Sequence, residues 1–163
     1  MKVLAVDPGY DRVGFALVET QVQTNGATNE VCLHSETFQT SREEDFNTRL
    51  HQVGMRTREL IAQYAPTHLA IETLFFSKNQ KTAMQVAQAR GTIIYQALDL
   101  GLRVCEYSPQ QIKIAVTGHG GADKRAVVAM LQHLVALDTR TRLDDEYDAI
   151  ACALTCLASS RGK

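Results

Sequence analysis

Acidic residues stand at points of this sequence where carboxylates could do chemistry. Asp7 and Glu72 each end a short apolar run. Asp145 and Asp148 belong to an acidic segment nearer the C-terminus. Ionised carboxylates that meet at one place repel each other unless positive charge lies between them, and hard divalent cations such as Mg²⁺ or Mn²⁺ bind such oxygen ligands. If the fold brings these acids together, we expect a site for two ions, which suits in-line cleavage of a phosphodiester.

Each of these acids also has an ordinary structural explanation. Asp7 precedes a Pro-Gly pair, and an Asp in that position commonly caps a turn. Asp145 and Asp148 are i,i+3 neighbours at a predicted helix start, where the helix dipole favours negative charge. Residues 144–148 hold four acids, more than a helix cap needs, so the acidic segment favours the metal site.

The hydrophobic pattern predicts the strands that would position Asp7. The unbroken apolar run of residues 3–6 suits a central strand that is covered on both faces. Together with the apolar run of residues 13–18 it is predicted to form a hairpin. Residues 31–40 are predicted as a third, more exposed strand, so the chain is expected to open as an antiparallel meander.

A helix and a fourth strand are expected to bring Glu72 to the same edge of the sheet. A Ser followed three residues later by a Glu has the spacing of a capping box, which predicts a helix over residues 41–64. The strand of residues 67–72 follows it. A strand, a helix and a strand normally form a right-handed crossover with the new strand parallel to an earlier one. If that neighbour is the first strand, Asp7 and Glu72 end side by side, where open α/β sheets place their chemistry.

Four helices and one more strand are predicted for the rest of the chain. They are a helix over residues 78–100, a fifth strand over residues 102–107, a helix that begins after Ser108, a helix over residues 122–137 and a last helix over residues 143–158. Gly91 inside the first of these helices costs about 1 kcal/mol relative to Ala, which favours a close helix contact there. The order of elements is that of a single α/β domain over residues 1–163.

Composition and run lengths limit the class of protein. The chain has 163 residues, of which 45% are hydrophobic, as in ordinary globular domains. Its apolar runs fall short of the ~18–20 residues that span a bilayer, and its first residues lack the pattern of a signal peptide. The four cysteines lack the spacing of a disulfide framework or of a zinc site. We therefore expect a cytoplasmic protein with reduced thiols and no membrane partner.

The charge distribution indicates a polyanionic substrate. The formal net charge of −1 and the pI near 6.5 argue, taken alone, against nucleic-acid binding. Residues 78–142, however, hold nine Lys and Arg against four Asp and Glu. A basic middle beside concentrated carboxylates suits a metal site that works on a nucleic-acid backbone.

Short motifs along the chain occur in an order that is typical of a known family. They are Asp7-Pro-Gly with Gly14, Ala70-Ile-Glu72 followed by Phe75, Lys78-Asn79, Gln88-Ala-Arg-Gly91 and Asp145-x-x-Asp148-Ala149. Together they closely resemble the RuvC family of Holliday-junction resolvases, and the resemblance extends from Val3 to about Leu157. It implies an α/β, ribonuclease H-like fold, with a five-stranded mixed sheet of three antiparallel and then two parallel strands, flanked by helices.

The resemblance also implies roles for individual residues. The residues that match the family's catalytic, metal-binding acids are Asp7, Glu72, Asp145 and Asp148. The choice of Asp145 rests on the Asp-x-x-Asp-Ala register. The residues expected to bind DNA are Phe75, Lys78, Arg90, Lys113 and Lys124. The residue types alone favour Phe75 as a buried core side chain, whereas the resemblance implies that it contacts the centre of a junction.

The activity implied by the resemblance is the resolution of four-way DNA junctions in recombination and repair. A homodimer would make two symmetric nicks that leave 5′-phosphate and 3′-hydroxyl ends, with Mg²⁺ or Mn²⁺ as cofactor and two ions in each active site. The family usually prefers thymine-rich cleavage sites. The implied partners are four-way junction DNA and the RuvA–RuvB branch-migration complex.

Three other functions share part of this pattern. YqgF-type ribonuclease H-like nucleases, which process ribosomal RNA, have a first motif similar to Asp7-Pro-Gly-x-x-Arg12-x-Gly14, but the Gln-Ala-Arg-Gly stretch and Phe75 count against them. Actin-like and sugar-kinase ATPases also open with a strand, an Asp-x-Gly turn and a strand, but they need a second domain for which this chain has no room. A non-catalytic junction-binding protein would not need all four acids.

Overall fold

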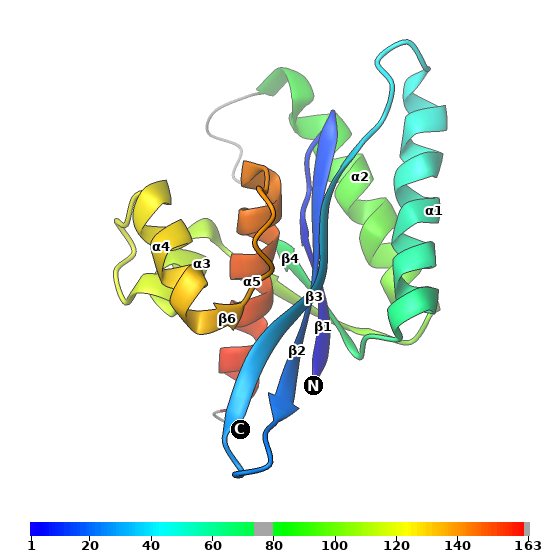
Figure 1. The fold of residues 1–163 in the computed structure, drawn as a ribbon. Helices are drawn as coiled ribbons and strands as arrows, with labels where there is room; N and C mark the ends of the chain where they lie inside the picture. Colours follow the sequence, from blue (N-terminus) through cyan, green and yellow to red (C-terminus); the bar gives the residue numbers. More distant parts are fainter. Residues whose placement is uncertain (74–79, 162–163) are drawn as a thin grey trace.

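A six-stranded mixed sheet in the order β5-β4-β1-β2-β3-β6 forms the centre of the molecule (Figure 1). The computed structural model describes residues 1–73 and 80–161. The strands are β1 (Lys2–Asp7), β2 (Arg12–Val22), β3 (Thr28–Gln39), β4 (His68–Glu72), β5 (Arg103–Tyr107) and β6 (Val135–Ala136). The helices are α1 (Phe46–Tyr64), α2 (Gln80–Asp99), α3 (Pro109–Thr117), α4 (Lys124–Leu134) and α5 (Asp144–Arg161).

The central strand β1 has the neighbours that the sequence predicts. It pairs antiparallel with β2, in a register that sets Asp7 opposite Gly14. It pairs parallel with β4, in a register that sets Val6 beside Ile71. The crossover through α1 therefore returns the chain to the strand that bears Asp7, and the carboxyl ends of β1 and β4 meet at one edge of the sheet.

The sequence predicted five strands, and the sixth is a short addition at the far edge. The predicted helix over residues 122–137 ends at Leu134. Val135 takes extended backbone angles, φ −137° and ψ 136°, and pairs in parallel with Glu30 of β3. Its β-branched side chain is buried, 3% exposed, against the same core as α4. Tertiary packing and the free edge of β3 thus override the helical pattern at this point.

Helix α1 begins later than the capping-box pattern predicted. Its N-cap is Asp45, whose carboxylate accepts hydrogen bonds from the backbone N–H groups of Asn47 and Thr48. The expected start at residue 41 is therefore wrong, because the first free N–H groups of the helix are those that the Asp45 carboxylate satisfies. The helix predicted to begin after Ser108 does begin there, and Ser108 and Gln111 form a capping box at its start.

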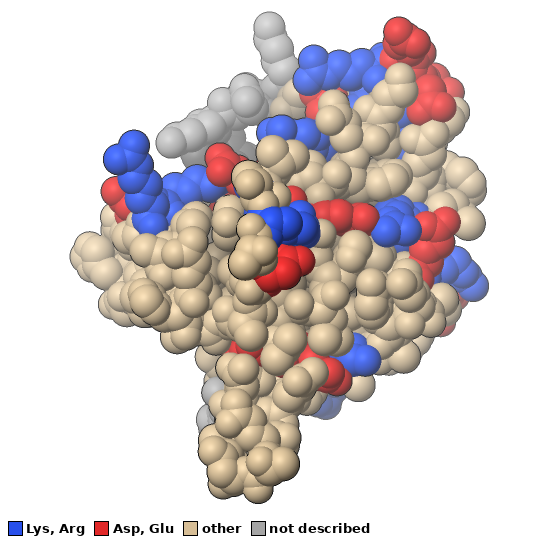
Figure 2. Space-filling view, viewed as in Figure 1, with Lys and Arg blue, Asp and Glu red and all other residues tan. Residues whose placement is uncertain are grey.

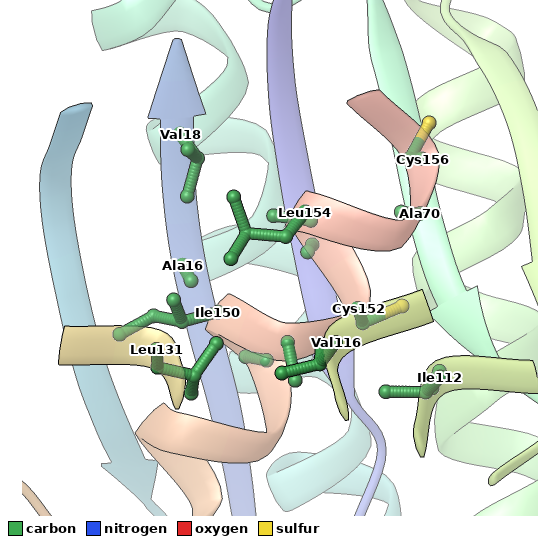
Figure 3. Close-up of a cluster of buried hydrophobic side chains, with 14 of the residues drawn as sticks. Ala16, Val18, Ala70, Ile112, Val116, Leu131, Ile150, Cys152, Leu154 and Cys156 are labelled. Atoms are coloured by element: carbon green, nitrogen blue, oxygen red, sulfur yellow. The ribbon is translucent and has the colours of Figure 1, made fainter. Parts of the chain in front are cut away.

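Helices cover both faces of the sheet. Helix α5 packs on one face, flanked by α3 and α4, and α1 and α2 pack on the other (Figure 1). Ile150 and Leu154 of α5 lie over Ala16 and Val18 of β2 (Figure 3). The intervening residues of the strands, such as Phe15, point into the second core beneath α1 and α2. The alternation of side chains along each strand accounts for the two separate cores.

The close helix contact expected at Gly91 lies elsewhere. A Cβ atom built on Gly91 would meet no atom of the described residues within 4 Å. On Gly54 of α1, in contrast, a Cβ atom would lie 2.9 Å from the Cγ2 atom of Thr92. The glycine that lets α1 approach α2 is therefore Gly54, and Gly91 faces open space within the part of the chain that the structure describes.

Charged side chains are unevenly spread over the surface. On the face seen in Figure 2, side chains of both signs gather near the end of the molecule where β1 and β4 finish, while the protruding β2–β3 hairpin is uncharged. Residues 21–29, which form this hairpin end, contain no Lys, Arg, Asp or Glu. The hairpin end therefore offers no charged side chain to a binding partner.

Candidate active site

The edge of the sheet and the first turn of α5 come together at the predicted site. Asp7 and Glu72 are the last residues of β1 and β4. Gly14 of β2 lies beside Asp7 and beneath the start of α5, where a Cβ atom would lie only 2.0 Å from the carbonyl oxygen of Asp145. Only glycine leaves room for this approach, so Gly14 is what allows the helix to bring its acids to the strand ends.

The electrostatics of Asp7 and Glu72 show that the four acids share one environment. Loss of solvent around the carboxyl, followed by repulsion from Glu72, Asp148 and Asp145, raises the pKa of Asp7 to about 7. Loss of solvent and repulsion from Asp148 raise the pKa of Glu72 to about 7. The structure therefore brings together the four acids that the sequence singled out, and their mutual repulsion calls for a positive partner.

Two basic side chains supply part of this positive charge. The Nζ atom of Lys124 lies 2.9 Å from Oδ2 of Asp148 and 3.3 Å from Oδ2 of Asp144. The Nε atom of Arg12 lies 3.3 Å from Oδ2 of Asp145. That buried oxygen accepts no hydrogen bond from the described residues, so Arg12 offsets its charge without saturating it. The site thus keeps an unsatisfied carboxylate oxygen of the kind that a cation binds.

The donor set fits a hard divalent cation. All four acids offer oxygen atoms, two of them have raised pKa values, and a buried oxygen of Asp145 accepts no hydrogen bond within the described residues. Within residues 1–73 and 80–161, no three acidic, His or Cys side chains already converge as ligands of one ion. Side-chain rotation would therefore be needed for these acids to ligate one ion together.

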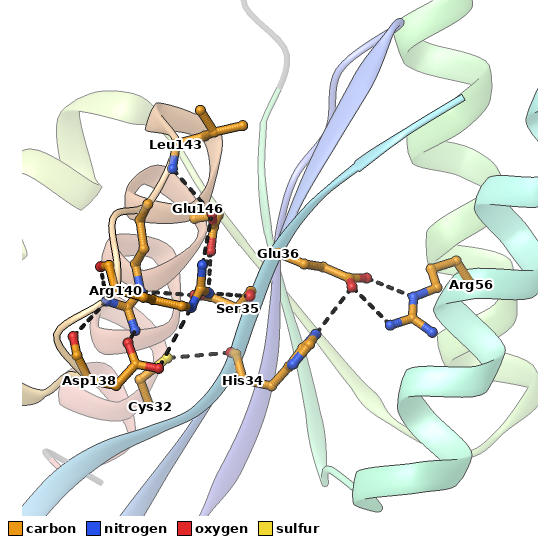
Figure 4. A network of polar contacts seen from close by, with 10 residues as sticks. Cys32, His34, Ser35, Glu36, Arg56, Asp138, Arg140, Leu143 and Glu146 are labelled. Atoms are coloured by element: carbon orange, nitrogen blue, oxygen red, sulfur yellow. Dashed lines mark hydrogen bonds and ion pairs between the residues drawn. The ribbon is translucent and has the colours of Figure 1, made fainter. Parts of the chain in front are cut away.

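The acidic segment separates into side chains with different surroundings. The Asp144 side chain is 75% exposed and contacts Lys124, whereas Asp145 faces Arg12. Glu146 is buried and points away from the other acids, toward Ser35 and Arg140 (Figure 4). Sequence spacing alone does not separate three adjacent acids. The burial pattern of a helix whose partner strand is known would have identified Glu146 as the inward-facing one.

Glu146 belongs to a polar network that ties α5 to β3. The Ser35 hydroxyl donates a hydrogen bond of 2.8 Å to Oε2 of Glu146, and Arg140 contacts the same oxygen at 2.5 Å. The other oxygen, Oε1, accepts the backbone N–H of Leu143 at 3.1 Å. Burial opposes ionisation of Glu146, but the bonds from Arg140 and Ser35 prevail and hold its pKa below the ordinary value. This network fixes the turn that carries Asp145.

Not all of the residues predicted to bind DNA lie beside the acids. Lys113 and Lys124 line a pocket of about 270 Å³ together with Glu72 and Asp148, so both lie at the acids. Arg90 instead donates from Nε to the carbonyl oxygen of Glu72 at 3.2 Å and forms an ion pair with Glu106. Its position supports the end of β4 from behind. The predicted residues Phe75 and Lys78 lie outside the described residues.

Comparison with known proteins identifies the family. Residues 3–156 match the sequence model of the family described as crossover junction endodeoxyribonuclease RuvC. The chain belongs to the RuvC family. A RuvC of Moorella thermoacetica is 42% identical over 159 residues, which cover 98% of this chain and 92% of that protein. A RuvC of Heliobacterium modesticaldum is 40% identical over 161 residues, covering 98% and 95%. The nuclease class predicted from the motifs is thereby confirmed.

Solved RuvC structures confirm the fold class. The Thermus thermophilus RuvC structure superposes with a TM-score of 0.89 at 31% identity and covers 99% of this chain and 96% of that one. A structure of T. thermophilus RuvC in complex with Holliday junction substrate gives a TM-score of 0.89 at 30% identity, with the same coverage. The α/β, ribonuclease H-like prediction holds, with six strands where five were expected.

The raised pKa values of Asp7 and Glu72 predict how stability depends on pH. Their ordinary values are 3.8 and 4.5, so between about pH 4 and pH 7 the folded protein binds more protons here than the unfolded chain. The contribution of these groups to the free energy of unfolding therefore falls as pH rises through that range and stays low above it. Mg²⁺ should offset this loss, so we expect it to raise the melting temperature more at about pH 8 than at about pH 5. If Mg²⁺ raised the melting temperature equally at both pH values, metal binding would not depend on the ionisation of Asp7 and Glu72.

Paired variants of the two adjacent aspartates test the register of the site. Asp145→Asn is expected to lower nicking by roughly a hundredfold or more, because it removes a charge at the acids. Asp144→Asn is expected to change nicking by less than about threefold, because its side chain is exposed and its ion pair with Lys124 lies at the surface. Rates on a four-way junction at saturating Mg²⁺ check both. If Asp144→Asn lowered the nicking rate more than Asp145→Asn, the acid that belongs to the site would be Asp144.

Proposed function

We propose that this protein is a structure-selective DNA endonuclease that resolves four-way junctions by paired phosphodiester nicks. The observation that carries the proposal is that Glu72, Asp145 and Asp148 lie close enough to Asp7 to raise its pKa by repulsion, beside a pocket lined by Lys113 and Lys124. It is supported by the RuvC relative whose structure was solved with Holliday junction substrate.

The proposed roles of the residues follow from their chemistry. The four acids would hold Mg²⁺ or Mn²⁺, with two ions expected. When bound, these ions supply an activated water and stabilise the leaving oxygen. Lys113 and Lys124 would hold the phosphate by charge, which orients it against the acids. The products would carry 5′-phosphate and 3′-hydroxyl ends.

We propose the further partners on the basis of family membership. Residues 1–163 would form a single nuclease domain and act as a homodimer, so that each protomer makes one of two symmetric nicks, in concert with the RuvA–RuvB complex. Phe75, Lys78 and Arg90 would contribute to DNA binding. Among the helices of the described residues, none has the length and apolar character needed to cross a membrane. We propose a cytoplasmic location.

A nicking assay on a synthetic mobile four-way junction tests the proposal. The protein is mixed with the junction in Mg²⁺, in Mn²⁺ and in EDTA, and a matched linear duplex serves as control. Paired nicks at symmetric positions, present with metal and absent with EDTA, are the expected result. Binding without cutting in either metal would favour a non-catalytic junction-binding protein. Cutting of structured RNA alone would favour the ribosomal RNA nuclease.

A further inference from the structure

A second pocket lies on the other side of the acids from Lys113 and Lys124. Its volume is about 500 Å³, and its lining includes Asp11, Arg12, Gln39, Arg42 and Asp145. The sheet order β4-β1-β2-β3 separates the two pockets, because the first contains Glu72 of β4 and the second is built from the ends of β2 and β3. We call it the Arg12–Arg42 pocket. Asp145 is the acid that it shares with the candidate active site.

The floor of the Arg12–Arg42 pocket is held in place by a buried arginine. Arg49, only 5% exposed, donates from Nη2 to the carbonyl oxygen of Tyr10 at 3.2 Å and to Oδ1 of Asp11 at 2.8 Å. Its Nε donates to the Thr40 hydroxyl at 2.8 Å, and its Cζ lies 4.6 Å from the centre of the Tyr10 ring. The β1–β2 turn is therefore fixed before any ligand arrives, which lowers the entropic cost of binding.

The arginines at the rim of the pocket are available to a ligand. The Arg42 side chain is 74% exposed and donates to Oδ2 of Asp11 at 2.6 Å. The Arg12 side chain is 48% exposed and contacts Asp145 without hydrogen-bond geometry. Both keep most of their N–H donors free of the contacts described, because an arginine has five.

The charges that line the pocket balance, and the buried Arg49 beneath it adds one positive charge. Arg12, Arg42 and Arg49 stand against the carboxylates Asp11 and Asp145. A hydrogen bond from Arg49 lowers the pKa of Asp11, so Asp11 is ionised and its charge is offset within the pocket. Asp145 is shared with the proposed metal ligands. Once cations occupy the acids, the charge of Arg12 is no longer offset, and the net positive charge increases.

We propose that the Arg12–Arg42 pocket binds a backbone phosphate of the strand that the protein cuts. A nucleic-acid strand carries a charge at every nucleotide, so a strand whose phosphate reaches the acids brings neighbouring phosphates to both sides of them. Lys113 and Lys124 bind the strand on the β4 side of the acids. Arg12 and Arg42 bind a neighbouring phosphate of the same strand on the β2 side. Arginine suits this role because its planar group can bind two phosphate oxygens at once. The inference rests on the proposed function.

Charge-removing variants test the pocket directly. Arg42→Gln, and the double variant with Arg12→Gln, should weaken junction binding roughly three- to tenfold. The slope of log binding constant against log salt should fall by about one for each phosphate that the variant no longer neutralises. Binding is followed by fluorescence anisotropy in EDTA over a salt series, and a thermal melt verifies folding. Arg58→Gln is the matched control, because Arg58 is also 48% exposed and ion-paired, with Asp99 on α2, away from the acids.

Neutral methylphosphonate groups, placed one at a time around the nick, locate the phosphate. At one position, the neutral group is expected to weaken junction binding by the wild type. The same group should not weaken binding by the double variant any further. A wild-type salt slope for the double variant, or identical methylphosphonate maps for both proteins, would overturn the pocket assignment. If the wild type does not nick the junction in a parallel assay with Mg²⁺, the proposed function fails and the inference fails with it. Nicking by the wild type, with no change in the variants, rejects only the pocket.

Discussion

Replacing Asp7 with Asn is expected to lower the rate of junction nicking by roughly a hundred- to a thousandfold or more. The amide has nearly the same shape as the carboxylate but lacks the charge that would hold a cation. Lys113 and Lys124 are untouched, so junction binding should remain close to that of the wild type. Single-turnover nicking and anisotropy binding, measured on the same junction, separate the two effects.

The same variant is expected to be more stable than the wild type when metal is absent. At about pH 8 Asp7 is ionised beside three other acids, and Asn removes this repulsion. The gain in melting temperature should shrink as pH falls below about 7, because the wild-type carboxyl then takes up a proton. A variant that still cuts, or one that loses stability at pH 8, would show that Asp7 does not lie at the centre of the acid cluster.

Replacing Gly14 with Ala is expected to reduce both stability and nicking. The new Cβ atom would lie 2.0 Å from the carbonyl oxygen of Asp145, so the start of α5 must move away from β2. Overpacking of this kind costs about 1–3 kcal/mol in the free energy of unfolding. Since the displaced turn carries Asp145, nicking should fall even in conditions where the variant is fully folded.

Gly91→Ala is the matched control for Gly14→Ala. Gly91 lies inside a helix and, among the described residues, no atom comes within 4 Å of its Cβ position. The alanine should therefore stabilise the protein by about 0.5–1 kcal/mol through helix propensity. Urea denaturation compares the two variants. A Gly14→Ala protein as stable as Gly91→Ala would mean that α5 does not need close contact with β2.

The sequence was sufficient for the strands that hold Asp7 and Glu72. Their apolar runs are short and unbroken, and the crossover rule then leaves one arrangement in which both acids share an edge. It was not sufficient for β6, because the extended form of Val135 depends on the free edge of β3. Local pattern cannot show an edge that forms only after the sheet does.

The sequence alone could predict the acids of the candidate site, but not the residues that hold those acids in place. Asp7, Glu72 and Asp148 carry clear positional signals, whereas Asp144, Asp145 and Glu146 are adjacent and differ only in what surrounds them. Those surroundings come from Ser35, which lies far away in the sequence. The Arg12–Arg42 pocket is likewise built from two separate loops and leaves no contiguous motif.

The hydrogen bond between Ser35 and Glu146 joins residues that are 111 positions apart. Half of the acids therefore arrive on a helix that is synthesised long after the sheet strands that it must meet. A chain emerging from the ribosome can form the β1–β2–β3 meander early, but it has only Asp7 and Glu72 until residues 144–161 are made and dock. If the four acids act together as proposed, an unfinished chain does not yet have the complete set.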